Sequence, residues 1–228
     1  MSRLLTVYQL GLVEYDEAFA FQRRLVEDFI ASPDDAGALI LLEHPPVITI
    51  GRSGDKANIL ASQPELDRAG IKVRETNRGG DVTYHGPGQV VGYPILPLVH
   101  HGKDVHAYMR RLESVLMALL WEYGIKATRR PGLTGVWTEQ GKIVSIGVAI
   151  SRWVSYHGFA LNVAPDMGHF RMIHPCGLVG VQMASMESIL GRAPDRTEVK
   201  RRLIRLFCTE FMFDETRQLA HMDGWRKT

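Results

Sequence analysis

The segment from Arg78 to Gln89 combines chain-breaking residues with side chains that could do chemistry. It reads Arg-Gly-Gly-Asp-Val-Thr-Tyr-His-Gly-Pro-Gly-Gln, and its four glycines and one proline are expected to break any regular element. Glycine lacks the Cβ that would keep a ligand away from the backbone. Loops on a rigid scaffold commonly carry binding and catalysis. A Gly-Gly or Pro-Gly pair alone would indicate a surface turn, but this density of polar groups predicts a binding loop.

The two cysteines of the chain have different surroundings. Cys176 lies between Pro175 and Gly177; the proline fixes φ before it, and the glycine leaves the sulfur and the following N–H accessible. That setting suits a nucleophile, although the residues alone leave a structural thiol open. Cys208 lies in a predicted helix after Phe207, where a thiol is expected to be a small buried apolar residue.

A nucleophilic thiol needs a helper, because the thiolate is the reactive species. His174 is two positions from Cys176, but the two side chains share a face only if Pro175 does not redirect the chain. Lys142 opens an apolar strand over 143–150. Partial desolvation there would let its ammonium stabilise a thiolate within ~4–6 Å. A lysine at a hairpin edge is otherwise an ordinary solvated charge, and both interpretations stay open at this point.

Composition bounds the class of protein. The chain has 228 residues and 45% hydrophobic composition, which is enough for a full core. Lys and Arg number 27 against 25 Asp and Glu, for a net charge of +2, which is too mild to indicate nucleic-acid binding. Basic runs at Arg129-Arg130 and at Lys200-Arg201-Arg202 with Arg205 are either solvated faces or docking sites for an acidic protein.

No Cys/His spacing suggests a metal site. The N-terminal residues do not read as a signal peptide, and no stretch is long and apolar enough to span a membrane. We therefore expect a cytoplasmic protein without metal.

Helical spacing of apolar residues predicts helices over 15–30, 104–123 and 196–211. Strand patterns cover 39–42, 47–50, 136–138, 143–150 and 155–163, with a hairpin turn over 139–142. Mixed elements and short turns predict an α+β fold with a mixed, largely antiparallel sheet flanked by helices. We expect one catalytic domain over 1–228, in which the part from about residue 180 is a candidate helical cap.

Four ordered motifs resemble those of the lipoyl(octanoyl) transferases. They are RGGDVTYHGPGQVVGYPI from Arg78, GVWTEQGKIVSIGVAI from Gly135, YHGFALNV from Tyr156 and HPCGLVGVQMAS from His174. The early stretch around Glu43 to Gly51 matches as well, so the resemblance covers about residues 40–190. It implies a catalytic domain like those of the biotin and lipoate protein ligases.

The resemblance implies an acyltransferase that moves an octanoyl or lipoyl group from acyl carrier protein to a lysine of lipoyl domains. These domains would be those of 2-oxoacid dehydrogenase E2 subunits and the glycine cleavage H protein. It implies that Cys176 forms an acyl-thioester, that Lys142 activates the thiol and moves protons, and that no ATP or metal is needed. The implied substrate-binding residues are Arg78, Gly79, Gly80, Asp81, Val82, Thr83, Tyr84, His85, Ser145, Ile146, Gly147, Gly158, Phe159 and Ala160. His174 and the region after Ser185 receive no role.

Two other functions remain as alternatives. An ATP-dependent lipoate or biotin ligase of the same fold would activate a free acid without Cys176, and a non-catalytic protein would hold acyl carriers without forming an adduct. A cysteine hydrolase is a weaker third. For a transferase, an oxyanion donor is also needed, and we expect the N–H of Gly177 or one from Arg78-Gly79-Gly80.

Overall fold

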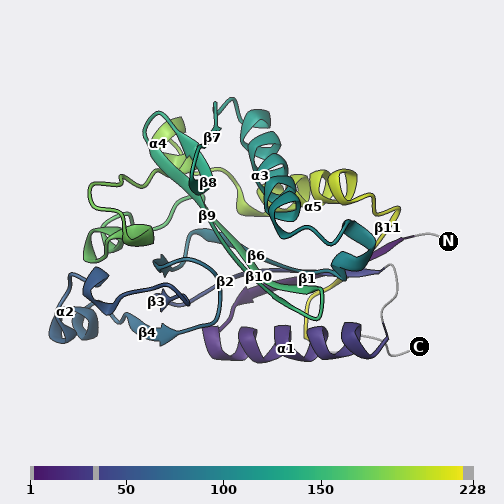
Figure 1. The fold of residues 1–228 in the computed structure, drawn as a ribbon. Coiled ribbons are helices and arrows are strands. Elements are labelled where there is room, and N and C mark those ends of the chain that lie inside the picture. Colours follow the sequence, from purple (N-terminus) through teal and green to yellow (C-terminus); the bar gives the residue numbers. More distant parts are fainter. Residues whose placement is uncertain (1–2, 33–35, 223–228) are drawn as a thin grey trace.

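A computed structural model describes residues 3–32 and 36–222, and a large twisted sheet forms its centre (Figure 1). Within these residues the sheet has eight strands, in the order β11-β1-β2-β6-β10-β9-β8-β7. Their bounds are β1 Leu4–Leu12, β2 Gly37–Glu43, β6 Gln89–Ile95, β7 Thr128–Arg130, β8 Leu133–Thr138, β9 Gly141–Ser151, β10 Val154–Asn162 and β11 Glu215–Leu219. The pairs β11–β1 and β1–β2 are parallel and the other neighbours are antiparallel. The predicted mixed, largely antiparallel sheet is confirmed.

Helices cover both faces of this sheet, and Figure 1 shows α1 (Tyr15–Ala31) on one side and α3 (Val105–Glu122) with α5 (Arg196–Phe211) on the other. Alternation along a strand sends neighbouring side chains to opposite faces. In β2, Leu39 and Leu41 join the core under α3 and α5, whereas Ile40 and Leu42 join the core under α1. All three predicted helices are present within one or two residues of their expected ends.

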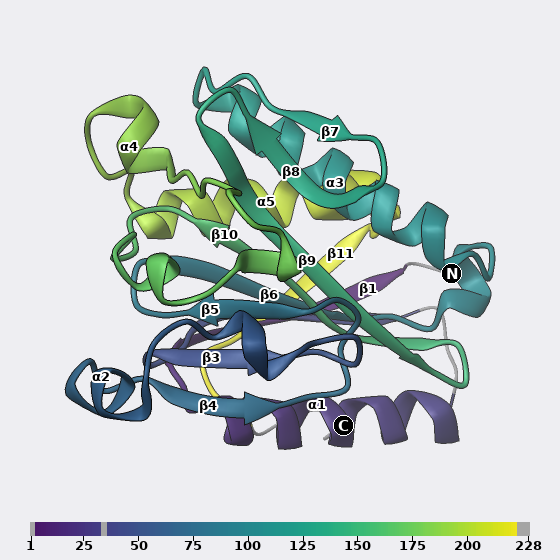
Figure 2. The ribbon, with the colours of Figure 1, turned by 60° about the vertical axis from the view of Figure 1, so that its left-hand side comes forward.

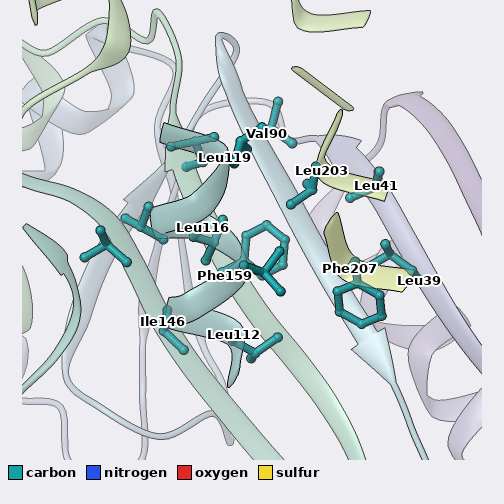
Figure 3. Packing of buried hydrophobic residues seen from close by; sticks show 14 of the residues in the cluster. Leu39, Leu41, Val90, Leu112, Leu116, Leu119, Ile146, Phe159, Leu203 and Phe207 are labelled. Carbon is teal, nitrogen blue, oxygen red and sulfur yellow. The ribbon is translucent and has the colours of Figure 1, made fainter. Parts of the chain in front are cut away.

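The core under α3 and α5 is built from leucines and phenylalanines of both helices against the sheet. Figure 3 shows Leu116 of α3 and Phe207 of α5 packed near Phe159 of β10. Because α5 shares this core and β11 pairs with β1, the described chain after residue 180 is packed onto the main sheet. A separate helical cap remains a prediction about domain organisation.

A second, smaller sheet lies beside the first in Figure 2. Among the described residues it has three strands, in the order β4 (Lys72–Glu75), β3 (Val47–Ile50) and β5 (Val82–His85). Helix α2 (Gln63–Arg68) packs with it through Leu66. The remaining short elements are α4 (Met186–Leu190) and the turns η1 (Lys56–Asn58), η2 (Leu98–His101), η3 (His169–Met172) and η4 (Pro175–Gly177).

The expectation that no regular element forms between Arg78 and Gln89 is wrong, because Val82–His85 is strand β5, antiparallel to β3. These four residues alternate. Val82 and Tyr84 enter the hydrophobic core of the small sheet, here called the small core, with Ile48 and Leu66. Thr83 and His85 are buried toward the main sheet. The glycines on either side obscured a short strand of β-branched and aromatic residues.

No helix in the part of the chain that the structure describes is both long and apolar enough to cross a membrane.

Candidate active site

Cys176 lies in the short turn η4, with an unusual backbone conformation. Its φ of 60° and ψ of 21° are left-handed, a region that non-glycine residues rarely adopt. Gly177 follows with φ 70°. Two left-handed residues in a row turn the chain sharply at the sulfur, and such strain tends to gather at functional sites.

The amine of Lys142 reaches the sulfur of Cys176. Nζ donates to Sγ over 2.9 Å, well within the distance at which an ammonium stabilises a thiolate. Lys142 is only 2% exposed, so the alternative of a solvated hairpin lysine is wrong. The cysteine and lysine are adjacent even though 34 positions separate them.

A backbone pairing brings the two residues together. Lys142 N–H donates to Gln182 O, and Ala184 N–H donates to Lys142 O, each over 2.9 Å. Residues 182–184, which follow Cys176 in the chain, therefore run beside the start of β9. This pairing holds the turn that contains Cys176 next to Lys142. Gly141 permits this approach, because a Cβ there would lie 2.4 Å from the carbonyl oxygen of Gln182.

Two residues of β8 shape the space around the lysine, and the sequence pattern assigned a role to neither of them. A Cβ on Gly135 would lie 2.6 Å from Cε of Lys142, and the glycine itself has φ 122°. The ring of Trp137 lies 5.4 Å from Nζ, within the range of a cation–π contact. The sequence does contain a signal for this arrangement, because a glycine and, two positions later, a tryptophan precede the candidate catalytic lysine.

Asp81 holds the cysteine turn from the other side. Its Oδ2 accepts from Asn58 Nδ2 over 2.7 Å, and its Oδ1 accepts from the backbone of Val82. Asn58 also accepts the N–H of His174 through its own carbonyl oxygen, over 2.7 Å. This links the Arg78–Gln89 segment to the residues just before Cys176. Nothing in the sequence pattern singled out Asn58.

Arg78 is a buried brace at the edge of the site. Its guanidinium donates to Thr49 O over 2.6 Å and to Asp81 O over 2.7 Å, and also to the Thr49 hydroxyl. Burial lowers the pKa of Arg78, while nearby groups that include Tyr15 and Cys176 oppose the shift. The arginine ties β3 to the glycine loop and contributes positive potential beside the sulfur.

A cavity between the two sheets, here called the inner pocket, opens at Cys176. It holds about 480 Å³ of empty space, part of it open to solvent. Thirteen of the fourteen predicted substrate-binding residues line it; within the described chain it is Tyr84 that does not. The hydroxyl of Tyr84 is instead hydrogen-bonded to Nδ1 of His169 over 2.8 Å, and its ring packs in the small core. Strands β5, β9 and β10 supply most of the lining.

Three side chains that were not among the predicted substrate-binding residues complete this pocket: Tyr15, Tyr93 and His157. Tyr15 is predicted by the sequence only as an apolar helix residue. His157 bonds Asn77 Oδ1 over 2.8 Å, and burial lowers its pKa to about 3. Burial likewise lowers the pKa of His85 well below its usual range. The histidines facing the pocket are therefore neutral near pH 7.

Two polar atoms in this pocket have no hydrogen-bond partner among residues 3–32 and 36–222: Thr83 Oγ1 and His85 Nδ1. Both side chains are 6% exposed. Buried polar atoms normally find partners, so this pair is consistent with a site that a ligand or water completes.

Some of the backbone N–H groups expected to stabilise the oxyanion already donate to other acceptors. The N–H of Gly177 donates to His174 O over 3.0 Å, and that of Gly79 donates to Val148 O over 2.8 Å. Both are occupied, so the expectation for Gly177 is wrong in this conformation. The backbone N–H groups of Arg78 and Gly80 have no acceptor within the described part of the chain, so these two of the expected donors are not engaged.

Cys208 lies away from this arrangement, whereas His174 takes part in it through backbone hydrogen bonds. Cys208 packs in α5 against the main core, and burial raises the pKa of its thiol to about 11. His174 borders a separate hollow with Phe170 and Gln182, and its role stays open.

The chain matches known proteins over most of its length. Residues 14–208 match the family model of the lipoyl protein ligase A/B catalytic domain. An octanoyltransferase of Geotalea uraniireducens is 48% identical over 91% of this chain and 95% of its own length.

Solved structures share the fold at low identity. Lipoate-protein ligase A bound with ATP superposes with a TM-score of 0.73 at 15% identity, over 97% of this chain and 91% of that one. A bi-partite lipoate protein ligase from Thermoplasma acidophilum, studied with its E2 lipoyl domain, gives 0.69 at 16% identity, over 95% and 89%.

Proposed function

The chain belongs to the lipoyl protein ligase A/B catalytic domain family and, within it, to the octanoyltransferases of lipoate biosynthesis, and from this premise we propose that it transfers the octanoyl group through a thioester on Cys176. The observation that carries the proposal is the 2.9 Å contact between Nζ of the buried Lys142 and Sγ of the half-buried Cys176. It lies where the inner pocket meets the nucleophile.

In the first step, the thiolate of Cys176 attacks the carbonyl carbon of an octanoyl thioester on an acyl carrier protein. A new C–S bond to Cys176 forms and the bond to the pantetheine sulfur breaks. Lys142 gives its proton to the departing thiolate and becomes a neutral amine. Thioester exchange is nearly thermoneutral, so the step needs no nucleotide. This divides one transfer into two easier ones.

In the second step, the neutral ε-amine of a lipoyl-domain lysine attacks the thioester on Cys176. Lys142 takes a proton from that nitrogen as the amide forms, and the C–S bond breaks to restore the thiolate and the ammonium. Each step passes through a tetrahedral oxyanion, for which we infer the N–H of Gly80 as a donor.

The acyl tail would lie in the inner pocket. Ile146, Phe159 and Ala160 give apolar contacts, while Gly147 and Gly158 leave space. Each methylene taken out of water contributes ~0.8 kcal/mol. The proposed partners are octanoyl-acyl carrier protein and the lipoyl domains of 2-oxoacid dehydrogenase E2 subunits and of the glycine cleavage H protein. The proposed location is the cytoplasm.

Trapping the intermediate tests the proposal. After incubation with octanoyl-acyl carrier protein, intact-mass analysis should find one octanoyl adduct that maps to Cys176, and adding a lipoyl domain should discharge it. Cys208 is the internal comparison, because partial burial raises the pKa of its thiol to about 11. An adduct on Cys208, or transfer by a Cys176→Ala variant, would contradict the proposal.

The ATP-dependent ligase is the second candidate, since one structural neighbour is a ligase bound with ATP. Such an enzyme activates free acid as an adenylate and does not use a cysteine. We propose that neither ATP nor a metal takes part here. Nucleotide consumption with free octanoate and a lipoyl domain, at a rate matching transfer, would favour the ligase.

A further inference from the structure

A second hollow meets the inner pocket at Cys176. This outer groove runs past α3, the β7–β8 turn and the loop after β3, and holds about 1250 Å³ of empty space open to solvent. The residues that border it are Arg52, Ser53, Gly79, Gly80, Asp81, Val105, Met109, Gly132, Leu133, Thr134, Trp137, Lys142, Ile146, Gly147, Val148, Cys176 and Leu178. Both cavities reach the sulfur, and the proposed acyl tail uses one of them. The two linings share Gly79, Gly80, Asp81, Ile146, Gly147 and Cys176.

The outer groove has apolar walls and cations at its rim. Met109 and Leu133 supply apolar contacts, and Arg52 is exposed at the edge. Arg130 is also exposed and stacks 4.3 Å from the ring centroid of Trp137, a groove residue. Neither arginine has a carboxylate partner among the described residues. Asp81, the acid on the border, is engaged with Asn58.

Trp137 provides an unused donor. The residue is 1% exposed, and its indole Nε1 has no hydrogen-bond acceptor in the described ranges. Buried N–H groups normally have a hydrogen-bond partner. Trp137 is among the residues that border the groove, so we infer that a carbonyl oxygen of an occupant takes the place of the missing acceptor.

On the basis of the proposed function, we propose that the outer groove binds the phosphopantetheine arm of the acyl donor. The arm is extended and largely aliphatic, carries two amide groups and ends in a phosphodiester. Arg52 and Arg130 would pair with the phosphate, Trp137 would donate to an amide carbonyl, and Lys142 would meet the thioester sulfur at the inner end. The basic pair Arg129-Arg130 acquires a role through its second member.

The acceptor lysine fits these features less well. Its side chain has four methylenes and an amine, so it offers no anion to the two arginines and no carbonyl oxygen to the indole. Like charges placed close together also repel. The unpaired arginines and the unpaired indole N–H therefore favour the phosphopantetheine arm of the acyl donor over the acceptor lysine as the occupant of the groove.

Three octanoyl thioesters separate the contributions: octanoyl-4′-phosphopantetheine, octanoyl-pantetheine and octanoyl-ethanethiol. The rate constant for loading Cys176, measured by intact mass at low salt, is compared among them. We expect the phosphate to accelerate loading about tenfold through the two arginines. The Arg52→Ala/Arg130→Ala double variant should abolish that advantage. Arg24→Ala, an exposed arginine on α1 across the sheet, should retain it.

Trp137→Phe keeps the ring and removes the N–H. We expect its ratio of loading by octanoyl-pantetheine to loading by octanoyl-ethanethiol to fall about fivefold, because one hydrogen bond of about 1 kcal/mol is lost. Comparing two donors on one variant cancels any effect on Lys142.

The outcomes distinguish the groove from the reaction. Normal acylation of Cys176 with no phosphate advantage would overturn the groove assignment and leave the proposed function standing. Slower discharge of preloaded enzyme to a lipoyl domain in the double variant, with loading unchanged, would give the groove to the acceptor and overturn the proposal. Failure of all three thioesters and of octanoyl-acyl carrier protein to acylate Cys176 would refute the proposed function itself.

Discussion

The carboxylate of Asp81 lies directly against the backbone of Gly177, so close that a Cβ on this glycine would be 2.3 Å from Oδ2. The residue after Cys176 is therefore restricted in two ways, by this contact and by its φ of 70°. Gly180, in the same loop, has φ 79°, but a Cβ on that glycine would meet no atom within 4 Å.

Gly177→Ala should disturb the cysteine turn, because the methyl group displaces Asp81 in addition to straining the backbone. We expect octanoyl loading of Cys176 to fall at least tenfold, as measured by intact mass. Gly180→Ala shares only the strain of roughly 1–2 kcal/mol and should load normally. Equal losses in both variants would show that backbone strain alone matters.

Lys142→Ala should make the reactivity of Cys176 strongly dependent on pH. Without the ammonium, a thiol is ionised mainly at pH ~10, so alkylation at neutral pH should fall far more than alkylation at pH ~10. Because both pH values are measured on the same variant, any loss of reactivity caused by the cavity at position 142 affects both measurements. Lys126→Ala, at an exposed position, serves as the control. An equal loss at both pH values would limit Lys142 to structure or to later proton transfer.

Ala160→Val should shift acyl selectivity toward shorter chains, since Ala160 lines the inner pocket. Two added methyl groups displace part of the tail, at ~0.8 kcal/mol per methylene lost. Octanoyl loading should fall about tenfold relative to butanoyl loading. Ala149→Val, equally buried in the core under α1, lies outside the described pocket lining and should keep the wild-type ratio.

Stability should decrease below about pH 6.5 through the buried histidines. Burial depresses the pKa of His157 to about 3 and that of His44 to about 4. Between those values and the unfolded value of ~6.5, the unfolded chain binds more protons, so the free energy of unfolding falls by up to ~1.4 kcal/mol per pH unit per group.

His157→Asn should flatten this dependence, as seen by urea denaturation from pH 7 to 4.5. Asparagine tolerates the left-handed φ of 54° at this position. His106→Asn, at an exposed site, should leave the wild-type slope unchanged. A slope that persists in the His157 variant would assign the dependence to other groups.

Local patterns predicted the helices better than the sheet. The stripe over 15–30 and the one over 196–211 repeat at helical spacing within a single segment, so each helix is legible by itself. Strand β11, by contrast, has the residues Glu-Thr-Arg-Gln-Leu and exists through its pairing with β1. Pairing between distant segments leaves little trace in either strand.

In the site, too, local sequence patterns predicted the types of residue, but not the contacts between distant segments. Cys176 and Lys142 were identifiable by type and motif, but burial of the lysine depends on Gly135, Trp137 and the strand-like pairing of residues 182–184. The contact through Asn58 joins three segments, and none of them reveals it alone. Tyr84 carried the right motif and still faces the small core, because alternation in β5 decides its side.

Lys142 borders the outer groove, whereas the described lining of the inner pocket contains Cys176 without it. In the proposed reaction, Lys142 therefore transfers protons from the side of the outer groove, while the hydrocarbon tail lies in the inner pocket. Under that proposal, the acyl tail can stay in the inner pocket while the acyl carrier protein leaves and the lipoyl domain takes its place at Cys176.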